Sequence, residues 1–390
     1  MRFEFAAPAR ILFGQGTIAE AGPAAATMLD AQSRGRRAFV VAGRDGSRLA
    51  PLAASLDAAH LAYDRFALAG EPRFEDLRAA LAQARAADCG IVIGFGGGSA
   101  LDLAKALAAL LANPGDPLDY AEVIGGGKAL SLPSYPCIAI PTTAGTGAEV
   151  TRNAVLCSSE HNVKVSLRSP TMLPSLAIVD PEQSYAMPPR ITAQTGMDAL
   201  AQLLEPLVCS FSNPLVDALC REALPRVARS LVRAYRDGGD VSAREDMAYA
   251  SLSGGLALAN ARLGAVHGFA GPLGGAYPIP HGAACAALLA PVAAVNVAAL
   301  RARAPESPAL ARYAEAASML RGGAPSRPED AADALRELAA SLGISGLGSY
   351  GLHKGDFSVI VQKAAAASSM KGNPLALLPD ELLAILDAAL

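Results

Sequence analysis

Ile91-Val92-Ile93-Gly94-Phe95-Gly96-Gly97-Gly98-Ser99 runs from an apolar segment into a glycine-rich turn, and a helical pattern resumes at Ala100. Glycine lets the backbone approach a ligand closely, and the free N–H groups at the start of a helix attract negative charge. Ser99 is expected to cap that helix and to donate to a phosphate oxygen. The dinucleotide motif GxGxxG is not met, because Ser99 takes the place of its last glycine when counting starts at Gly94. The turn therefore predicts a phosphate-binding loop, with a purely structural turn as the alternative.

Apolar runs of strand length alternate with Ala-rich helical patterns around this turn, which is typical of βαβ units in a parallel sheet. After Pro188-Pro189 the strand patterns nearly vanish, and Ala/Leu-rich helical segments run to Leu390. We therefore predict an α/β domain over residues 1–186 and an all-helical domain over residues 187–390. Residues 321–328 are predicted as a surface loop between helices. The expected strands are Ala38 to Ala42, Ile91 to Phe95, Cys137 to Ile140 and Leu176 to Val179, and the clearest helices are Phe74 to Ala87 and Ala100 to Ala112.

A second polar, glycine-containing segment follows another predicted strand. It reads Pro141-Thr142-Thr143-Ala144-Gly145-Thr146-Gly147-Ala148-Glu149. Its hydroxyls and bare backbone offer hydrogen bonds to a sugar or a base, and a capped strand-to-helix loop is the alternative. Because two such loops follow successive strands, we expect them to share one ligand at the carboxyl edge of the sheet.

The composition favours a globular protein with a small-molecule partner. Of the 390 residues, 52% are hydrophobic and 18% are charged, and the formal net charge is -3. No dense Lys/Arg block occurs, so neither nucleic acid nor an anionic membrane is an expected partner. Residues 1–5 alternate charge with aromatics and lack the layout of a signal peptide, so a cytoplasmic location is expected.

The uncharged stretch from Gly282 to Leu300 and most of the cysteines are predicted to lie in the hydrophobic core. The stretch from Gly282 to Leu300 is free of charge and nearly long enough to span a bilayer, but it is mostly Ala and contains Pro291 and Asn296, so a buried helix is predicted. The cysteines lack CxxC spacing and mostly lie in apolar contexts, so reduced core residues are predicted. They are Cys89, Cys137, Cys157, Cys209, Cys220 and Cys285.

A candidate metal site comes from the helical half. His267 and His281 each precede a glycine, and Asp198 is placed at the start of a helix with Gln202 one turn later on the same face. One carboxylate and two imidazoles are a sound donor set for a divalent transition metal with open positions for a substrate oxygen. Structural histidines are the alternative.

These segments together resemble the iron-containing, or group III, alcohol dehydrogenase family. The resemblance covers nearly the whole chain and is carried by five segments in order. They are Phe13-Gly14-Gln15-Gly16, Gly96 to Lys105, Pro141 to Val150, Gly196-Met197-Asp198-Ala199-Leu200, and Gly264 to Gly282. The resemblance implies an N-terminal dinucleotide-binding domain, a C-terminal helical domain, an active site in the cleft between them, and a homodimer.

The resemblance also implies roles for individual residues. Gly97, Gly98 and Ser99 match the pyrophosphate site, with Asp102 at the start of the next helix. Lys164 matches a lysine that reaches the nicotinamide ribose, and it is expected in the catalytic group. Asp198, His267 and His281 match three metal ligands and are expected to be catalytic. The remaining cofactor-contacting positions are Thr142, Thr143, Thr146 and Thr151.

Three positions depart from the family pattern. Gln202 stands where iron enzymes of the family carry a histidine, and it is a weaker neutral donor, so iron, zinc as in the related glycerol dehydrogenases, and a metal-free enzyme are all open. Gly271 stands where many relatives have a histidine near the nicotinamide, which leaves the proton donor unassigned. After the strand at Ala38 to Ala42, Gly43-Arg44 replaces the usual aspartate, so we predict a preference for NADP(H), with Arg44 pairing to the 2′-phosphate. A solvated Arg44 is the alternative.

The function predicted on these grounds is hydride transfer between NAD(P)H and a small aldehyde or ketone, or the reverse oxidation, with metal assistance. Arg152 and Asn153 follow the second loop and are expected near the substrate. Arg152 would recognise an anionic tail, as in relatives that reduce maleylacetate or phosphonoacetaldehyde, and a surface arginine is the alternative. Two other functions stay open: a lyase of the dehydroquinate-synthase kind, and a nucleotide-binding protein without catalysis.

Overall fold

The computed structural model describes residues 2–31, 34–161 and 163–390. Internal contacts divide the chain into two compact units. The α/β unit comprises Ala7–Thr143 and Gly147–Ser184, and the helical unit comprises Tyr185–Leu390 together with Ala144–Thr146 and the N-terminal residues up to Ala6. The boundary predicted at residue 186 lies beside the division at Tyr185. The assignment of the short segment Ala144–Thr146 to the helical unit was not predicted.

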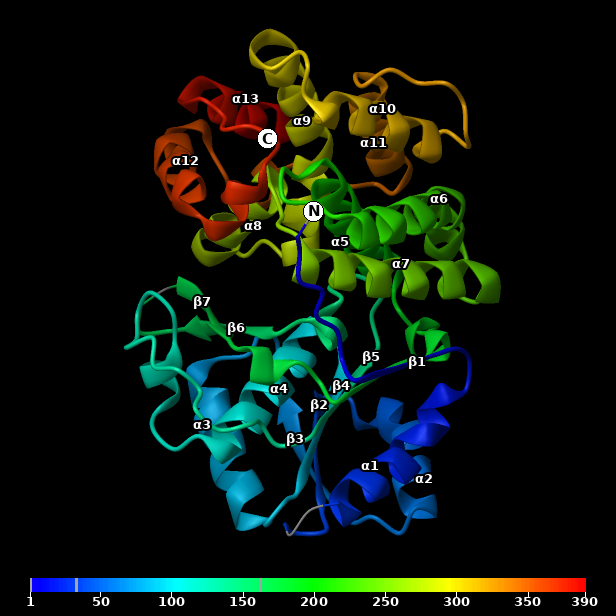
Figure 1. Ribbon diagram of the computed structural model, residues 1–390, viewed down its shortest axis with the longest axis vertical. Helices are drawn as coiled ribbons and strands as arrows, with labels where there is room; N and C mark the ends of the chain where they lie inside the picture. The colour runs from blue at the N-terminus through cyan, green and yellow to red at the C-terminus, as the bar shows by residue number, and fades with distance from the viewer. Residues whose placement is uncertain (1, 32–33, 162) are drawn as a thin grey trace. The chain divides into compact units, whose positions relative to one another are not determined.

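The α/β unit is built on a six-stranded sheet in which every neighbouring pair is parallel (Figure 1). The strand order is β1-β8-β5-β4-β2-β3, so the chain changes direction across the sheet between β2 and β4. A separate antiparallel hairpin, β6-β7, joins this unit. The bounds are β1 Arg10–Phe13, β2 Ala38–Gly43, β3 Tyr63–Leu68, β4 Ile91–Gly96, β5 Cys137–Pro141, β6 Asn153–Ser158, β7 Val163–Arg168 and β8 Leu176–Val179.

Alternate residues of the strands face two separate hydrophobic cores. Phe39 and Val41 of β2 pack in a core with α3 and α4, while Val40 and Ala42 pack with α1 and α2 in a core on the opposite face. Both faces of the central strands are therefore buried, which is why they read as continuous apolar runs. The helices are α1 Ala21–Asp30, α2 Ala50–Ala58, α3 Phe74–Ala86 and α4 Gly98–Ala112, with short 3-10 turns η1 Thr17–Glu20, η2 Gly46–Leu49, η3 Pro117–Tyr120, η4 Ala148–Val150, η5 Pro170–Met172 and η6 Pro181–Ser184.

The close packing of α4 on β4 depends on Gly94. A Cβ at this position would stand 2.9 Å from the Cβ of Ala104 and 3.1 Å from a methyl carbon of Leu101. Only a residue without a side chain lets the helix lie this near the strand. The glycine in the middle of β4 therefore allows α4 to pack closely against the same strand.

The four predicted strands are confirmed, and two sheet strands and the hairpin were missed. The missed strands β1 and β3 are the two edges of the sheet. Most residues of these strands are exposed or only partly buried, including Asp64 and Arg65 of β3, so their sequences lack the apolar run on which the prediction depended. The hairpin likewise alternates buried with exposed or partly buried positions.

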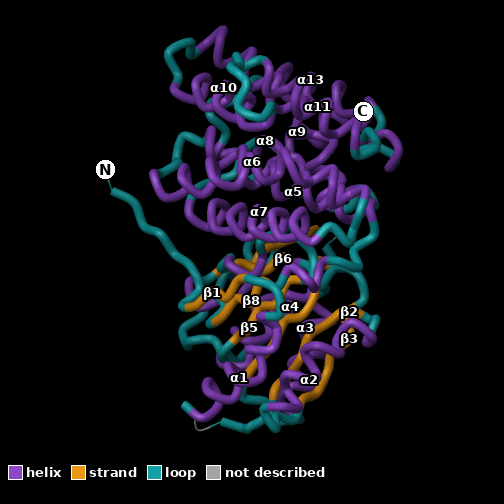
Figure 2. Tube along the Cα trace, turned by 90° about the vertical axis from the view of Figure 1, so that its right-hand side faces the viewer, coloured by secondary structure: helices purple, strands orange, loops and turns teal. Residues whose placement is uncertain are grey.

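The helical unit packs its helices around α5 and α9, and among the described residues all strands belong to the other unit (Figure 2). Its largest core comprises Ala144 and residues between Met187 and Ala389, and it consists mainly of Ala, Leu and Val. The predicted loop at 321–328 joins α10 to α11 and is largely exposed. The helices are α5 Pro189–Val208, α6 Pro214–Arg236, α7 Val241–Asn260, α8 Ala265–Ala276, α9 His281–Arg303, α10 Pro308–Leu320, α11 Asp330–Ser341, α12 Phe357–Ala366 and α13 Pro379–Ala389, with 3-10 turns η7 Leu347–Tyr350, η8 Lys354–Asp356 and η9 Ser368–Gly372.

The uncharged stretch from Gly282 to Leu300 forms most of α9, as predicted. By length and composition alone α9 is apolar enough to cross a membrane, but 72% of its most apolar 18-residue window is buried inside the protein. A central helix of a helical core has the same composition, because every side of it contacts other helices.

Candidate functional site

A cavity of about 650 Å³ lies at the carboxyl edge of the sheet in the α/β unit. It is formed where β2, β3, β4 and β5 end, which includes the point between β2 and β4 where the chain reverses direction across the sheet. Ligands of open α/β sheets bind at this kind of position. The residues from the two predicted loops and from the end of β2 lie together here, as Ala42, Gly43, Arg44, Asp45, Arg48, Phe95, Gly96, Gly97, Ser99, Ala100, Thr142 and Thr143.

The two loops are held against each other by the backbone. Thr142 N donates to Gly96 O at 2.9 Å, and a Cβ at Gly97 would stand 3.3 Å from the side chain of Thr143. Gly97 is the N-cap of α4, so the helix starts at Gly98 and Ser99 lies inside its first turn. The prediction that Ser99 caps the helix is therefore wrong. Ser99 still lines the cavity beside the free N–H groups of α4.

Six of the predicted cofactor residues line this cavity and five do not. Asp102 lies one turn into α4, where it accepts a hydrogen bond from Val155 N at 2.9 Å and pairs with Lys105 at 2.9 Å. Lys164 of β7 pairs with Glu71 at 2.6 Å. Side-chain contacts within the unit thus occupy Asp102 and Lys164. The predicted cofactor residues that line the cavity are Gly43, Arg44, Gly97, Ser99, Thr142 and Thr143, and the predicted cofactor residues outside its lining are Gly98, Asp102, Thr146, Thr151 and Lys164.

Below the second loop, a buried lysine and a buried glutamate lie near each other. Lys105 Nζ donates to Ala148 O and to Thr151 Oγ1, both at 2.9 Å. Glu149 is 1% exposed, and neither of its carboxyl oxygens has a hydrogen-bond partner. Burial raises the pKa of Glu149 from 4.5 to about 7, although the charge of Lys105 opposes the rise. The sequence offered no sign that this glutamate is buried.

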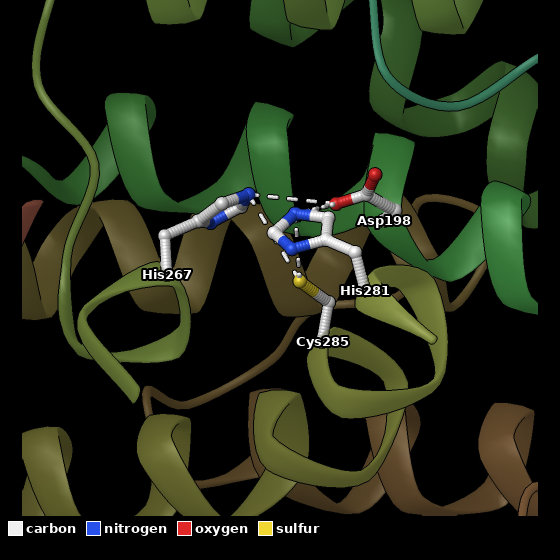
Figure 3. A group of neighbouring side chains, drawn as sticks. All are labelled: Asp198, His267, His281 and Cys285. Atoms are coloured by element: carbon white, nitrogen blue, oxygen red, sulfur yellow. Dashed lines mark hydrogen bonds and ion pairs between the residues drawn. The ribbon is translucent and has the colours of Figure 1, made fainter. Parts of the chain in front are cut away.

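The candidate metal residues lie together in the helical unit (Figure 3). Asp198 and Gln202 project from the same face of α5, His267 is the third residue of α8, and His281 is the first residue of α9. Asp198 lies in the middle of α5 rather than at its start, so that part of the prediction is wrong. The expected placement of Gln202 one turn after Asp198 is confirmed.

The geometry of the cluster points its donor atoms inward. Asp198 Oδ1 lies 3.4 Å from His267 Nε2 and 3.6 Å from His281 Nε2. This oxygen has no hydrogen-bond partner. Gln202 Oε1 is also buried without a partner. The side chains of Asp198 and His267 are 2% and 7% exposed, whereas that of His281 is 44% exposed, so solvent reaches the cluster at His281.

Glu205 orients His267. It was not identified from the sequence as a residue of the site. It lies two turns after Asp198 on α5, and its carboxylate accepts from His267 Nδ1 at 2.6 Å and from Val266 N at 2.7 Å. A Cβ at Gly264 would stand 2.9 Å from this carboxylate, so the glycine before α8 allows the approach. With Nδ1–H donated to Glu205, Nε2 of His267 is left with its lone pair toward the cluster. The spacing of Asp198, Gln202 and Glu205 along one helix face was the available signal.

Cys285 was also missed. It lies on α9 one turn after His281, and its Sγ is 3.6 Å from His281 Nε2 and 4.0 Å from His267 Nε2. The six cysteines are all free, and five of them are buried, as the sequence predicted. Cys285 differs from an inert core cysteine because its sulfur faces two imidazoles.

The negative groups of the cluster favour a positive charge between them. Burial opposes the charged imidazolium, yet Cys285 and Glu205 raise the pKa of His267 well above its ordinary value. Cys285 and Asp198 likewise raise the pKa of His281. Burial works against ionisation of Asp198 as well, and the two histidines nevertheless lower its pKa. A divalent cation supplies the same compensation more strongly than protons do.

The predicted substrate residues lie at the start of the hairpin. Arg152 directly precedes β6, its carbonyl accepts from Ser169 N at 3.1 Å, and Asn153 is the first residue of β6, opposite Arg168.

Gly271 lies exposed on α8, and a Cβ there would meet nothing within 4 Å. The position therefore has room for a larger side chain.

The sequence of this chain matches one known protein family in both of its units. Residues 8–181 match the sequence family described as iron-containing alcohol dehydrogenase, and residues 192–390 match the C-terminal part of the Fe-containing alcohol dehydrogenase family. The chain belongs to the iron-containing alcohol dehydrogenase family. It is therefore an NAD(P)-dependent oxidoreductase that interconverts alcohols and aldehydes, and the oxidoreductase prediction is confirmed over the lyase and non-catalytic alternatives.

Individual members of the family match over most of their length. The chain is 35% identical to alcohol dehydrogenase 4 of Saccharomyces cerevisiae over 319 residues, which cover 82% of this chain and 80% of that protein. It is 33% identical to sulfoacetaldehyde reductase of Bilophila wadsworthia, covering 97% of each chain. Its fold matches the crystal structure of sulfoacetaldehyde reductase from Bifidobacterium kashiwanohense in complex with NAD+, with a TM-score of 0.87 and 30% identity over 100% of this chain and 99% of that one.

Proposed function

We propose that this family member is an NADP(H)-preferring reductase of small anionic aldehydes that uses a divalent metal held by Asp198, Gln202, His267 and His281. The observation that carries the metal site is the buried Asp198 Oδ1, which faces two imidazole nitrogens and has no hydrogen-bond partner. A carboxylate oxygen left without a partner in the protein interior is costly unless a cation compensates it. The α/β unit would bind the cofactor in the cavity at the end of β2, β4 and β5.

The residues present fit a divalent metal. Asp198 supplies an anionic oxygen, His267 and His281 supply nitrogens, and Gln202 Oε1 is a second buried oxygen without a partner. Nitrogen and oxygen donors of this kind suit iron and zinc. When bound, the metal supplies a Lewis acid for the substrate oxygen, and the nicotinamide supplies or accepts the hydride.

The chain's own residues prepare this site in three ways. Glu205 fixes the tautomer and the ring orientation of His267 through the 2.6 Å contact with Nδ1. Apolar side chains around α5 exclude water, since Met197, Ala199 and Leu200 beside Asp198 are fully buried. The exposed edge of His281 leaves one side through which a small substrate can enter.

The metal site is tested by His267→Ala, with His353→Ala as a matched control. His353 is an exposed histidine outside the cluster. We expect His267→Ala to lose bound metal, measured by elemental analysis, and to lose most of kcat, whereas His353→Ala keeps both. Full activity with unchanged metal content in His267→Ala would show that the site is placed wrongly.

The NADP(H) preference is supported by the charges that line the cavity. Arg44 and Arg48 both line it beside Gly43, and the one acidic lining residue, Asp45, accepts hydrogen bonds from Ser47 N and Ser47 Oγ. Two guanidinium groups against one carboxylate favour a phosphate on the adenosine ribose.

The cofactor proposal predicts a higher kcat/KM with NADPH than with NADH. Arg44→Ala is expected to lower kcat/KM for NADPH by about tenfold, the loss of roughly one charge-assisted hydrogen bond, and to leave the value for NADH nearly unchanged. Equal losses with both cofactors, or a wild-type ratio that favours NADH, would contradict the role given to Arg44.

An anionic substrate is supported by Arg152 and Asn153, which are consecutive residues where β6 begins, and by two similar proteins that are sulfoacetaldehyde reductases. An arginine can bind a sulfonate, carboxylate or phosphonate through two parallel hydrogen bonds. We propose that Arg152 binds such a group on the substrate and that Asn153 contacts its polar atoms.

Paired substrates test this proposal. With sulfoacetaldehyde and the neutral propionaldehyde compared at one cofactor concentration, Arg152→Ala should raise KM for the sulfonate by about tenfold or more and leave KM for the neutral aldehyde unchanged. Arg168→Ala, which changes the arginine opposite Asn153 in the hairpin, is the control. Unchanged discrimination between the two aldehydes in Arg152→Ala would refute the role of this residue.

A further inference from the structure

Cys285 lies where a fourth donor to the metal cluster would lie. It is on α9 one turn after His281, its side chain is fully buried, and Figure 3 shows its sulfur directed at the two imidazole rings. One donor atom from each of Asp198, His267, His281 and Cys285 lies within 4.8 Å of every other. Four donors this close together define a site of the size of one ion.

The separations match the edges of a tetrahedron around zinc. Bonds of about 2.0–2.1 Å to nitrogen and oxygen and about 2.3 Å to sulfur place two N/O donors about 3.3 Å apart and a nitrogen about 3.6 Å from the sulfur. The observed distances from Asp198 Oδ1 to the two Nε2 atoms are 3.4 and 3.6 Å, and those from Cys285 Sγ are 3.6 and 4.0 Å. These four edges are each within about 0.4 Å of the tetrahedral values, and the other two edges are no longer than 4.8 Å.

Gln202 is less well suited to be the fourth ligand. Its amide oxygen is uncharged, and it lies beside α7, 3.6 Å from the position that a Cβ on Gly254 would take. Asp198 Oδ1 and Gln202 Oε1 are both buried without a hydrogen-bond partner, and Asp198 Oδ1 lies 3.4 and 3.6 Å from the two imidazole nitrogens. A thiolate is a far stronger donor to a transition metal than an amide oxygen.

We propose that the Cys285 thiolate is the fourth protein ligand of a zinc ion held by Asp198, His267 and His281. The proposal rests on the metal site proposed above and changes its donor set from Asp, Gln, His, His to Asp, His, His, Cys. The thiol releases its proton to solvent when the metal binds. The sulfur favours zinc over iron, because soft thiolate donors in a tetrahedral set with nitrogen select zinc.

Cobalt substitution tests the ligand directly. Co²⁺ replaces the metal in the apoprotein of the full chain, and a sulfur ligand produces an intense near-ultraviolet charge-transfer absorption that N and O ligands do not. We expect one equivalent of Co²⁺ to produce this absorption in the wild type, and both Cys285→Ala and Cys285→Ser to lose it. The matched control is Cys220→Ala, which removes another fully buried cysteine of the helical unit and should leave the absorption unchanged.

Metal affinity gives a second, quantitative readout. Loss of a direct ligand should weaken zinc binding by more than the about 10–100-fold that removal of a supporting residue brings. Zinc affinity of Cys285→Ser within a few fold of the wild type would overturn the proposal. So would charge-transfer absorption that persists in Cys285→Ala, or wild-type protein that binds Co²⁺ without that absorption.

X-ray absorption on the wild-type zinc protein keeps the test independent of any variant that fails to fold. One sulfur scatterer at about 2.3 Å supports the proposal, and a shell of nitrogen and oxygen alone refutes it. The two proposals fail differently. Wild-type protein that binds no metal refutes the metal site and the Cys285 ligand with it, whereas metal bound without sulfur refutes only the Cys285 ligand.

Discussion

Glu149→Gln should change how the stability of the α/β unit depends on pH. Glu149 is buried in η4 with no hydrogen-bond partner for either oxygen, and the nearby Lys105 donates to other acceptors. Burial raises its pKa from 4.5 to about 7, so the folded protein holds this carboxyl neutral at acidic pH. The glutamine amide in the variant has nearly the same shape as the carboxyl and no charge at any pH.

The size of the effect follows from the two pKa values. A rise from 4.5 to about 7 corresponds to about 3 kcal/mol between the protonation states. Because the folded pKa lies above the unfolded one, the stabilising contribution is complete below pH 4.5, declines as the pH rises, and is lost above about pH 7. The free energy of unfolding of Glu149→Gln minus that of the wild type should therefore increase by about 3 kcal/mol across this window and then stay constant.

The assay must report on the α/β unit alone. Urea unfolding at a series of pH values, sampled with a short deuterium pulse and read by mass spectrometry in peptides from β4 and β5, follows this unit separately from the helical one. Glu245→Gln, which alters an exposed glutamate on α7, is the control and should show no such pH-dependent difference.

The reasoning would be refuted by a difference between Glu149→Gln and the wild type that does not vary with pH, or one that decreases from acidic to neutral pH. A constant offset would mean that the pKa of the carboxyl is the same in the folded and the unfolded protein, and a decrease would mean that its pKa is lower in the folded protein. In the first case the charge of Lys105 would cancel the effect of burial, and in the second it would outweigh it.

Three further predictions concern the metal and the packing. Glu205→Gln should weaken zinc binding by about 10–100-fold in calorimetric titrations, because His267 loses its charged partner, while the exposed Glu337→Gln leaves affinity unchanged. Gly94→Ala should destabilise the α/β unit by about 1–3 kcal/mol in urea unfolding, since its Cβ would press on α4 at 2.9 Å, whereas Gly275→Ala, with nothing within 4 Å, should stabilise its helix by up to about 1 kcal/mol. Chelation of the metal should lower the stability of the helical unit by about 4 kcal/mol relative to protein held at a free metal concentration about a thousandfold above Kd, measured as a fall in Tm. No change in Tm on chelation, equal effects of the two glycine substitutions, or full affinity in Glu205→Gln would contradict these expectations.

Local patterns in the sequence were sufficient to predict the central strands and the glycine-rich turn. Central strands such as β4 are buried on both faces, so they appear as continuous apolar runs. The turn after β4 can be predicted because its glycines directly precede the start of a helix. Edge strands such as β3 were missed because their side chains are largely exposed or only partly buried and therefore carry no apolar run.

Which distant residues act together depends on how the helices pack. In the sequence, Glu205 and Cys285 have the pattern of a helix residue and a core cysteine. The packing of the helices places Glu205 against His267 and Cys285 against His267 and His281. Glu149 likewise becomes a group with a raised pKa only because packing removes it from water. Periodicity along one segment predicts which face is buried, but donor distances between segments arise from helix packing, which no single segment encodes.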